Sequence, residues 1–234
     1  MEEVVNNSFD NNKIIVALDY NDKKQALELS EKLDPSYCRL KIGKQLFTKY
    51  GPTIVDELQK MNFEIFLDLK FHDIPITVFK ACSEAYKLGI WMLNIHLLGG
   101  KEMVLAAREA RDTVNKKSKI IGVTLLTSHN KEGMTHLGMN TREDIVKSLS
   151  MIASDSKIDG IVCSPGDIRS INTSKNNLEF ITPGIRLGDD SNDHSKIYTP
   201  SAALELGSSY LVIGRPITEA KDPMSIVEKI KLMI

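Results

Sequence analysis

The chain has 234 residues, of which 42% are hydrophobic and 26% are charged, the balance of a globular protein with a buried core. Its net charge of −1 provides no general attraction for nucleic acid or for an anionic membrane, so an anionic ligand would need a local cluster of cations. Its three scattered cysteines form no Cys-x-x-Cys pair, which favours buried thiols in a reducing compartment.

The chain begins with an acidic and polar segment, MEEVVNNSFDNN. This segment lacks the basic stretch and the apolar run of a signal peptide, and we expect residues 1–12 to form a short N-terminal extension. The longest uncharged apolar stretch, residues 88–100, is too short to span a bilayer. We therefore expect a cytoplasmic protein.

The rest of the chain alternates short β-branched runs with longer helix-like segments. The predicted strands are Lys13–Asp19, Arg39–Gly43, Glu64–Lys70, Trp91–His96, Ile120–Thr127, Gly160–Cys163, Glu179–Pro183 and Tyr210–Gly214. The predicted helices are Asp22–Leu33, a segment ending near Met61, Ile76–Leu88, Lys101–Val114, Arg142–Ser154, a short helix beginning near Pro165, Pro200–Leu206 and Ser225–Ile234.

Strands that alternate with helices pair in parallel through right-handed crossovers. Eight such units in a chain of this length predict one α/β domain over residues 1–234, a closed (β/α)8 barrel. The alternative is an open doubly wound sheet. No Gly-x-Gly-x-x-Gly follows the first predicted strand, which argues against a dinucleotide-binding version of that sheet.

Charged residues stand near the ends of three successive predicted strands. Asp19 closes the first, Lys41 lies late in the second, and Asp68 and Lys70 share one face of the third. In a barrel these side chains would point inward at the C-terminal mouth, where barrel enzymes keep their chemistry. Asp73 follows the third strand at once. Buried charges of alternating sign cost too much desolvation to serve only as scaffolding, so we interpret these residues as a functional cluster.

Each member of the cluster also has a plain structural interpretation. Asp68 and Lys70 would form a structural ion pair, and Asp73 would cap the helix that follows it. A metal site is a further alternative, because Asp68, His72 and Asp73 offer ligands. Lys70 places a cation among those ligands and competes for the same carboxylates, so we expect no metal. The other histidines match no metal-ligand spacing.

Two glycine-containing loops follow the last two predicted strands, namely Thr182–Arg186 (TPGIR) and Ile213–Ile217 (IGRPI). In barrels, the loops after strands seven and eight often form a phosphate site. Glycine lets backbone N–H groups approach an anion and arginine binds phosphate through its fork, so Gly184, Gly214 and Arg215 are phosphate candidates. The residues thus predict a small phosphorylated substrate and a protonated lysine, held between carboxylates, that acts as a general acid.

The stretch DLKFHDIPITV, with KIG before it and TPGIR and IGRPIT after it, closely resembles the orotidine 5′-monophosphate decarboxylase family. The resemblance covers essentially the whole chain. Its Asp-x-Lys-x-x-Asp-Ile-Pro-x-Thr pattern is specific for that family, and FHDIP is typical of the bacterial branch. It implies a (β/α)8 barrel that acts as a homodimer, with sites at the subunit interface. It also implies decarboxylation of orotidine 5′-monophosphate to uridine 5′-monophosphate, the last step of de novo pyrimidine synthesis, without metal or organic cofactor.

Carried over by position, the resemblance implies a role for each candidate residue. Lys41, Asp68, Lys70 and Asp73 are its charged tetrad, in which Asp68 faces the departing carboxylate, Lys70 protonates C6 of the pyrimidine, and Asp73 comes from the neighbouring subunit. The implied substrate contacts are Asp19 and Lys41 on the sugar, Thr77 beside Asp73 on the ribose, Thr127 or Ser128 on the pyrimidine, Arg186 and Gly214 in the substrate site, and Arg215 on the phosphate.

One position departs from the family pattern. In the loop that ends at Thr199-Pro200, the family usually has a glutamine that bridges the phosphate and the base. Here the loop reads GDDSNDHSKIYTP, which places His194 at that position, and it is shorter than usual. Histidine can donate one ring N–H and cannot supply the same amide pair. We expect the polar loop Gly188–Ser195 to close over bound phosphate.

Two rival functions remain open. A sister barrel enzyme shares Asp-x-Lys-x-x-Asp but uses magnesium to decarboxylate or condense sugar phosphates, and the Asp-Ile-Pro-x-Thr pattern and Lys41 argue against it. A non-catalytic barrel that binds phosphosugars is the second rival, and the intact tetrad argues against it. Insensitivity to a chelator would distinguish this protein from the magnesium enzyme. An assay of orotidine monophosphate loss would distinguish it from the non-catalytic barrel.

Overall fold

The computed structural model describes residues 12–126, 128, 131–136, 138, 141–171, 177–188 and 198–234. The predicted N-terminal extension, residues 1–12, therefore lies outside the described residues except for Asn12. Among the described helices, none combines the length and the apolar character needed to cross a membrane.

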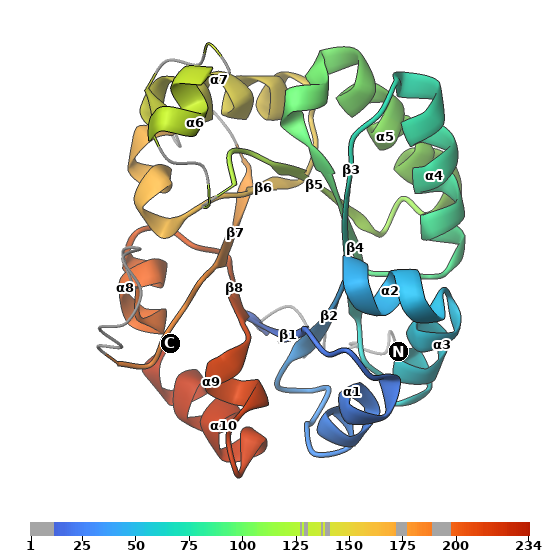
Figure 1. The fold of residues 1–234 in the computed structure, drawn as a ribbon, viewed down its shortest axis with the longest axis vertical. Helices are drawn as coiled ribbons and strands as arrows, with labels where there is room; N and C mark the ends of the chain where they lie inside the picture. Colours follow the sequence, from blue (N-terminus) through green and yellow to red (C-terminus); the bar gives the residue numbers. More distant parts are fainter. Residues whose placement is uncertain are drawn as a thin grey trace, which may run out of the picture.

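Eight parallel strands, all within the described residues, close into one barrel in chain order (Figure 1). The strands are β1 (Ile14–Leu18), β2 (Arg39–Gly43), β3 (Ile65–Phe71), β4 (Met92–His96), β5 (Lys119–Val123), β6 (Gly160–Val162), β7 (Glu179–Pro183) and β8 (Tyr210–Ile213). Each strand pairs with the next, and β8 pairs with β1. The predicted (β/α)8 barrel is confirmed, and the open sheet is excluded because the ring of strands is closed.

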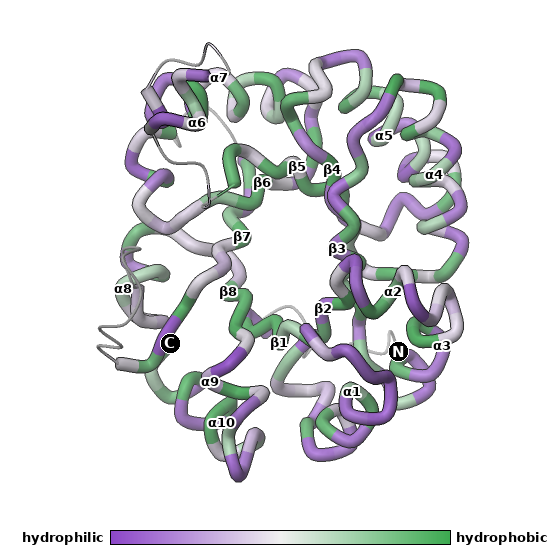
Figure 2. The backbone as a smooth tube through the Cα atoms, in the orientation of Figure 1, coloured by the Kyte–Doolittle hydropathy of each residue, from purple (hydrophilic) through white to green (hydrophobic). Residues whose placement is uncertain are grey.

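The helices surround the ring of strands (Figure 1). They are α1 (Lys23–Ser30), α2 (Lys44–Tyr50), α3 (Thr53–Lys60), α4 (Pro75–Lys87), α5 (Gly100–Val114), α6 (Lys131–His136), α7 (Arg142–Asp155), α8 (Pro200–Glu205), α9 (Arg215–Thr218) and α10 (Pro223–Met233), with 3-10 helices η1 (Leu97–Gly99) and η2 (Pro165–Ser170). Figure 2 shows hydrophobic segments concentrated in the ring of strands and hydrophilic ones on the outer helices.

Alternation along the strands produces two separate cores. On β1, Ile15 and Ala17 face the barrel interior, while Ile14 and Val16 pack under the helices. The interior core contains Ile15, Ala17, Phe66, Met92, Ile121, Ile181, Tyr210 and Val212. These side chains fill part of the barrel interior, and two of them, Phe66 and Val212, also line the cavity at its C-terminal mouth.

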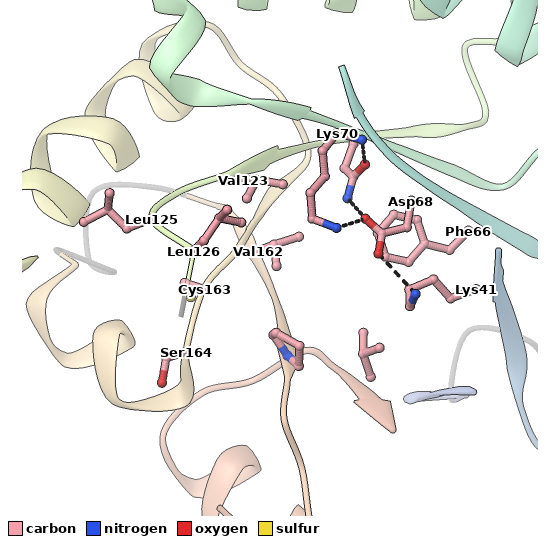
Figure 3. A pocket seen from close by; sticks show the side chains of 13 residues that line it. Lys41, Phe66, Asp68, Lys70, Val123, Leu125, Leu126, Val162, Cys163 and Ser164 are labelled. Carbon is pink, nitrogen blue, oxygen red and sulfur yellow. Dashed lines mark hydrogen bonds and ion pairs between the residues drawn. The ribbon is translucent and has the colours of Figure 1, made fainter. Parts of the chain in front are cut away.

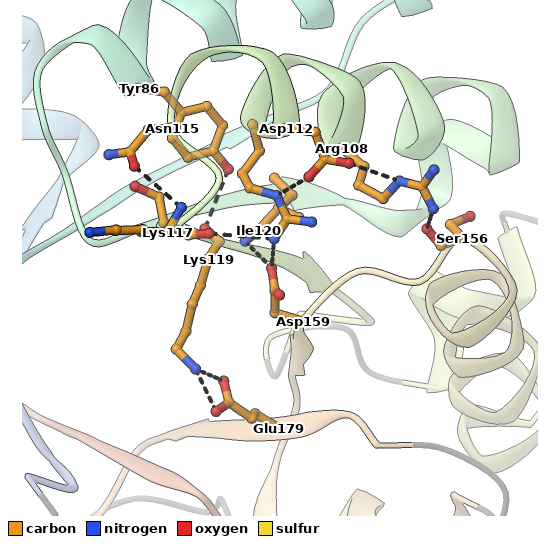
Figure 4. Close-up of polar contacts among 12 residues, drawn as sticks. Tyr86, Arg108, Asp112, Asn115, Lys117, Lys119, Ile120, Ser156, Asp159 and Glu179 are labelled. Atoms are coloured by element: carbon orange, nitrogen blue, oxygen red, sulfur yellow. Dashed lines mark hydrogen bonds and ion pairs between the residues drawn. The ribbon is translucent and has the colours of Figure 1, made fainter. Parts of the chain in front are cut away.

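A polar network stabilises the N-terminal end of the barrel (Figure 4). Lys119 at the start of β5 donates to both carboxylate oxygens of Glu179 at the start of β7, over 2.6 and 2.7 Å. Arg111 on α5 donates to Asp159 over 2.5 Å, and the same carboxylate oxygen accepts from the backbone N–H of Ile120 over 2.7 Å. These four charged side chains, Lys119, Glu179, Arg111 and Asp159, are therefore paired with one another.

Several element boundaries differ from the sequence-based predictions. The helix predicted to end near Met61 is two helices, because Gly51 adopts φ +61° and Pro52 has no N–H to continue a helix. β5 ends at Val123, so the predicted strand end at Thr127 is wrong, and Thr127 itself lies outside the described residues. Helices α6 and α9 were not predicted. Both are short, and α9 is a four-residue turn in a loop rich in helix-breaking residues.

Candidate active site

Lys41, Asp68 and Lys70 meet inside the C-terminal mouth of the barrel (Figure 3). Lys41 Nζ lies 3.2 Å from Asp68 Oδ2, and Lys70 Nζ donates to Asp68 Oδ1. Lys41 Nζ also lies 3.2 Å from Asp19 Oδ1. The Lys41 side chain is 8% exposed and that of Asp68 is 12% exposed, whereas that of Asp19 is 68% exposed. The structure thus places a carboxylate between two ammonium groups, with a second carboxylate at the rim.

Strand register explains why Lys41 points into the barrel. Ala17 on β1 pairs with Lys41 on β2, which in turn pairs with Phe66 on β3. Ala17 and Phe66 both belong to the interior core, and paired residues on adjacent strands share a face. Asp68 follows Phe66 by two residues and therefore points inward one layer higher.

The sequence analysis placed Lys70 on the same face as Asp68 because residues two apart on a regular strand share a face. Lys70 does not follow that regular alternation. Its φ is +51°, an uncommon conformation for a residue with a Cβ, and the β3–β4 register shifts between Leu67 and Phe71. The side chain still reaches Asp68. The prediction that the two residues meet is therefore right, but the expected backbone is wrong, because a local irregularity, rather than strand alternation, brings them together.

Asn94 on β4 is part of this cluster, and the sequence analysis missed it. Its Oδ1 accepts from the backbone N–H of Lys70 over 2.7 Å, and its Nδ2 donates to Asp68 Oδ1 over 2.6 Å. Asn94 is 1% exposed. The signal in the sequence was an amide inside the apolar strand WMLNIH, a residue type that rarely enters a strand interior without a partner.

Electrostatics keep Asp68 ionised. Burial alone raises the pKa of its carboxyl group, but the charges of Lys41 and Lys70, together with hydrogen bonds from Lys70 and Asn94, lower the pKa from 3.8 to about 2. At neutral pH the cluster therefore holds one carboxylate against two cations within one pocket. Such a site favours a ligand that develops negative charge close to Lys70.

The cluster forms one side of a cavity of about 160 Å³. Figure 3 shows Lys41, Asp68 and Lys70 on one wall and apolar side chains across from them. The apolar lining includes Phe66, Val123, Leu125, Leu126, Val162, Cys163, Pro183 and Val212. An apolar wall opposite a charged one suits a ligand with an apolar face and a polar or charged edge.

Asp73 and Thr77 lie apart from this pocket within one chain. Both are exposed, at the start of α4. Asp73 accepts from the backbone N–H of Ile74 over 2.7 Å, but the N-cap of α4 is Ile74 itself, so the alternative of Asp73 as the helix cap is wrong. Ile74 and Ile76 are large apolar residues beside it that are 61% and 55% exposed.

The two predicted phosphate loops follow strands whose C-terminal residues line the pocket. Pro183 at the end of β7 and Val212 near the end of β8 line the cavity, and Gly184 and Gly214 follow them closely. Gly184 adopts φ +81°, which a residue with a side chain would resist. An isolated bridge between Ile185 and Tyr198 ties the β7 loop to the segment before α8.

The other predicted substrate-binding residues are exposed, half-buried or outside the described residues. Arg215 is exposed at the start of α9, and Arg186 is half-buried, with its guanidinium donating to the Ile185 carbonyl over 3.1 Å. Ser128 is exposed. Thr127, His194 and all of the predicted mobile loop except Gly188 lie outside the described residues.

The candidate histidines lie at the rim of the mouth. His72 is exposed, and its ring centroid lies 5.7 Å from that of the half-buried His96. Burial, together with the nearby His72, Lys44 and Lys70, lowers the pKa of His96 to about 4. The part of the chain that the structure describes contains no group of three or more His, Cys, Asp or Glu side chains placed to hold a metal ion.

Comparison with known proteins assigns the chain to a family. Residues 12–230 match the family model described as the Orotidine 5'-phosphate decarboxylase / HUMPS family. An orotidine 5′-phosphate decarboxylase of Nitrosomonas europaea is 47% identical over 220 residues, covering 93% of this chain and 94% of that protein. One of Saccharophagus degradans is 46% identical over 221 residues, covering 93% of each.

Solved structures show the same relationship. The crystal structure of an orotidine 5′-phosphate decarboxylase from Lactobacillus acidophilus has a TM-score of 0.83 and 34% identity, covering 95% of this chain and 99% of that one. A Methanocaldococcus jannaschii orotidine 5′-monophosphate decarboxylase complexed with the inhibitor BMP has a TM-score of 0.76 and 26% identity, covering 94% and 97%. The chain therefore belongs to the orotidine 5′-phosphate decarboxylase / HUMPS family.

Proposed function

We propose that this protein decarboxylates orotidine 5′-monophosphate to uridine 5′-monophosphate and CO2 in pyrimidine nucleotide synthesis. The observation that carries the proposal is the contact of Asp68 with both Lys41 and Lys70 at a cavity whose other wall is apolar. The relatives of this chain at 46–47% identity, which bear the name of this activity, support it further.

In the proposed reaction, the pyrimidine lies against the apolar wall with its carboxylate toward Asp68. The bond between C6 and the carboxylate carbon breaks, CO2 leaves, and the electron pair stays on C6. The ammonium group of Lys70 stabilises this developing negative charge and then transfers its proton to C6. Lys70 regains a proton from solvent before the next turnover, so the reaction consumes one proton and needs no metal or organic cofactor.

The ribose and phosphate extend from the base toward the two glycine loops. Lys41 and Asp19 contact the sugar, and Arg186, Gly214 and Arg215 belong to the phosphate end, with the Arg215 fork on the phosphate itself. Gly184 supplies a further backbone approach to the anion. Thr127 or Ser128 holds the pyrimidine, and His194 stands where relatives of this type usually have glutamine.

The working unit in this proposal is a homodimer that shares its sites. Asp73 and Thr77 are exposed and stand outside the pocket of their own chain, next to the exposed Ile74 and Ile76. An exposed apolar surface beside two polar residues fits burial against a second copy of the chain. Asp73 would then complete the tetrad of the neighbouring site, and Thr77 would contact its ribose.

The test of the proposed function is an absorbance assay for loss of orotidine 5′-monophosphate by the purified protein, with and without a chelator of divalent cations. We expect turnover that is insensitive to the chelator. Activity that disappears with the chelator and returns with magnesium would contradict the metal-free reaction, which is the feature that separates this proposal from the sister barrel enzyme. Nucleotide binding without turnover would favour the phosphosugar-binding barrel.

A further inference from the structure

Arg142, the first residue of α7, reaches back to the segment that follows β5. Its Nη1 donates to the carbonyl oxygen of Leu126 over 3.2 Å, and its Nη2 donates to that of Leu125 over 3.3 Å. Both leucines line the cavity. The Arg142 side chain thus binds the backbone carbonyls of two residues that line the pocket, although Arg142 itself does not line it.

Asp167 on η2 orients this guanidinium group. Arg142 Nε donates to Asp167 Oδ1 over 2.9 Å and Nη2 donates to Oδ2 over 2.8 Å, which is a two-pronged pair. The Arg142 side chain is 27% exposed and that of Asp167 is 13% exposed. Asp167 Oδ2 also accepts from the backbone N–H of Ser164 over 3.3 Å, and Ser164 lines the same cavity. The pair therefore joins the loops after β5 and β6.

The sheet itself does not hold these loops. Among the described residues, the last backbone hydrogen bond between the two strand ends is the N–H of Thr124, which donates to the Val162 carbonyl over 3.2 Å. Beyond it, the carbonyl groups of Leu125 and Leu126 need other donors, because a shielded carbonyl without a partner is costly. The planar guanidinium of Arg142 donates from three nitrogens to two carbonyls and to both oxygens of one carboxylate, whereas a lysine has only three donors, all on one nitrogen.

We propose that Arg142 and Asp167 are positioning residues that set the pyrimidine end of the pocket and thereby its selectivity for the base. This inference rests on the proposed function. In the sequence, Leu125 and Leu126 directly precede Thr127 and Ser128, one of which is proposed to hold the pyrimidine. A shift of this segment changes the fit of the base and leaves the phosphate loops after β7 and β8 unchanged.

The experiment compares two ligands that differ only in the base, uridine 5′-monophosphate and ribose 5-phosphate, with calorimetric titration as the readout. Arg142→Met keeps the length of the side chain and removes the fork. We expect its affinity for uridine 5′-monophosphate to fall about tenfold, the order seen for a lost interaction worth about 1.4 kcal/mol, while the affinity for ribose 5-phosphate stays within about twofold. Asp167→Asn, which keeps the shape, should show a smaller loss in the same ligand. The two changes together should cost less than the sum of the single effects, because they remove one unit.

Arg111→Met is the matched control. Arg111 is also a shielded arginine that bonds an aspartate, Asp159, but at the N-terminal end of the barrel. It should lower the unfolding temperature without changing the ratio of the two affinities. Arg142→Lys should recover little of the lost selectivity, because an ammonium group cannot span the same acceptors.

The positioning role would be overturned if Arg142→Met weakened the binding of both ligands equally. It would also be overturned if the ratio of the two affinities were unchanged in both Arg142→Met and Asp167→Asn. Because Asp167→Asn is close in shape to the native residue, it keeps the test decisive if Arg142→Met does not fold. A wild-type protein that decarboxylates orotidine 5′-monophosphate while the variants keep its selectivity overturns this inference alone. A wild-type protein without that activity overturns the proposed function as well.

Discussion

The backbone N–H of Lys70 donates a hydrogen bond to Asn94 Oδ1 over 2.7 Å. This bond crosses from β3 to β4 where the register between the two strands shifts. Lys70 stands at φ +51°, a conformation that costs a residue with a Cβ about 1–2 kcal/mol. The other end of the same amide donates to Asp68. One buried side chain therefore supports both the uncommon backbone of Lys70 and the orientation of its carboxylate partner.

Replacing Asn94 should reduce turnover more than binding. Asn94→Leu removes both hydrogen bonds, so Lys70 and Asp68 lose their alignment, and we expect kcat to fall by about a hundredfold, the loss associated with a displacement of about 1 Å. The dissociation constant of uridine 5′-monophosphate should change much less. Asn94→Asp, which keeps an acceptor for Lys70 but loses the donor to Asp68, should also be impaired.

The control for Asn94 is Ser118→Ala. Ser118 is buried at the N-terminal end of the barrel, where its hydroxyl donates to the Ile90 carbonyl over 2.6 Å. Its loss should lower the unfolding temperature and leave kcat unchanged. If Asn94→Leu lowered only the unfolding temperature as well, Asn94 would be a purely structural residue.

Ionised Asp68 should stabilise the fold in a pH-dependent way. Its pKa is lowered from 3.8 to about 2, so its contribution is fully present above the unfolded-state value and is lost as the pH falls through the folded-state value. As the pH falls from about 5 to about 2, we expect the wild type to lose roughly 2 kcal/mol of unfolding free energy relative to Asp68→Asn. Denaturant unfolding at several pH values measures this, and a difference that does not depend on pH would contradict it.

Lys70→Ala should abolish turnover and leave nucleotide binding largely intact. The proposed proton donor is lost, while the phosphate loops and the apolar wall of the pocket remain. The measurement pairs the absorbance assay with titration of uridine 5′-monophosphate, and Lys24→Ala on the exposed face of α1 serves as the control. Near-normal turnover in Lys70→Ala would rule out this lysine as the proton donor.

Arg215→Ala should weaken the nucleotide and spare the nucleoside. A charged hydrogen bond to phosphate is lost, so we expect KM for orotidine 5′-monophosphate to rise roughly ten- to a hundredfold. Orotidine, which lacks the phosphate, should react with the variant and the wild type at similar rates. If both substrates suffer equally, Arg215 has a structural role instead.

Mixed dimers test whether Asp73 acts across the interface. Homodimers of Lys70→Ala and of Asp73→Asn should both be nearly inactive. In a mixed dimer, one site takes Lys70 from one chain and Asp73 from the other and is wild type, while the second site carries both lesions. With random exchange, about half of the dimers are mixed, so about one quarter of wild-type activity should return.

Two different affinity tags on the variants prove that subunits have exchanged. Confirmed exchange without recovery would mean that Asp73 acts in its own chain or not at all. Because the pocket of a single chain is lined by Lys70 but not by Asp73, action of Asp73 in its own chain would require the segment before α4 to move toward the pocket.

The sequence by itself determined the barrel and most of its charged cluster. Alternation along β1, with Ile15 and Ala17 on one face and Ile14 and Val16 on the other, specifies which face meets the interior and which meets the helices. The spacing of Asp68 and Lys70 predicted a charged cluster at this strand end, and the structure brings the two side chains into contact. These are local patterns, and local patterns are readable without a structure.

Only the tertiary structure decided how the cluster is held. Asn94 meets Lys70 and Asp68, and Arg142 meets Leu125, Leu126 and Asp167, through hydrogen bonds between residues that are 16 to 26 positions apart in the chain. The register shift that turns Lys70 away from regular alternation likewise depends on its pairing with β4. Such contacts depend on the relative register and tilt of neighbouring strands, which follow from packing of the whole barrel, and a polar residue in the sequence does not reveal which distant partner that packing will bring to it.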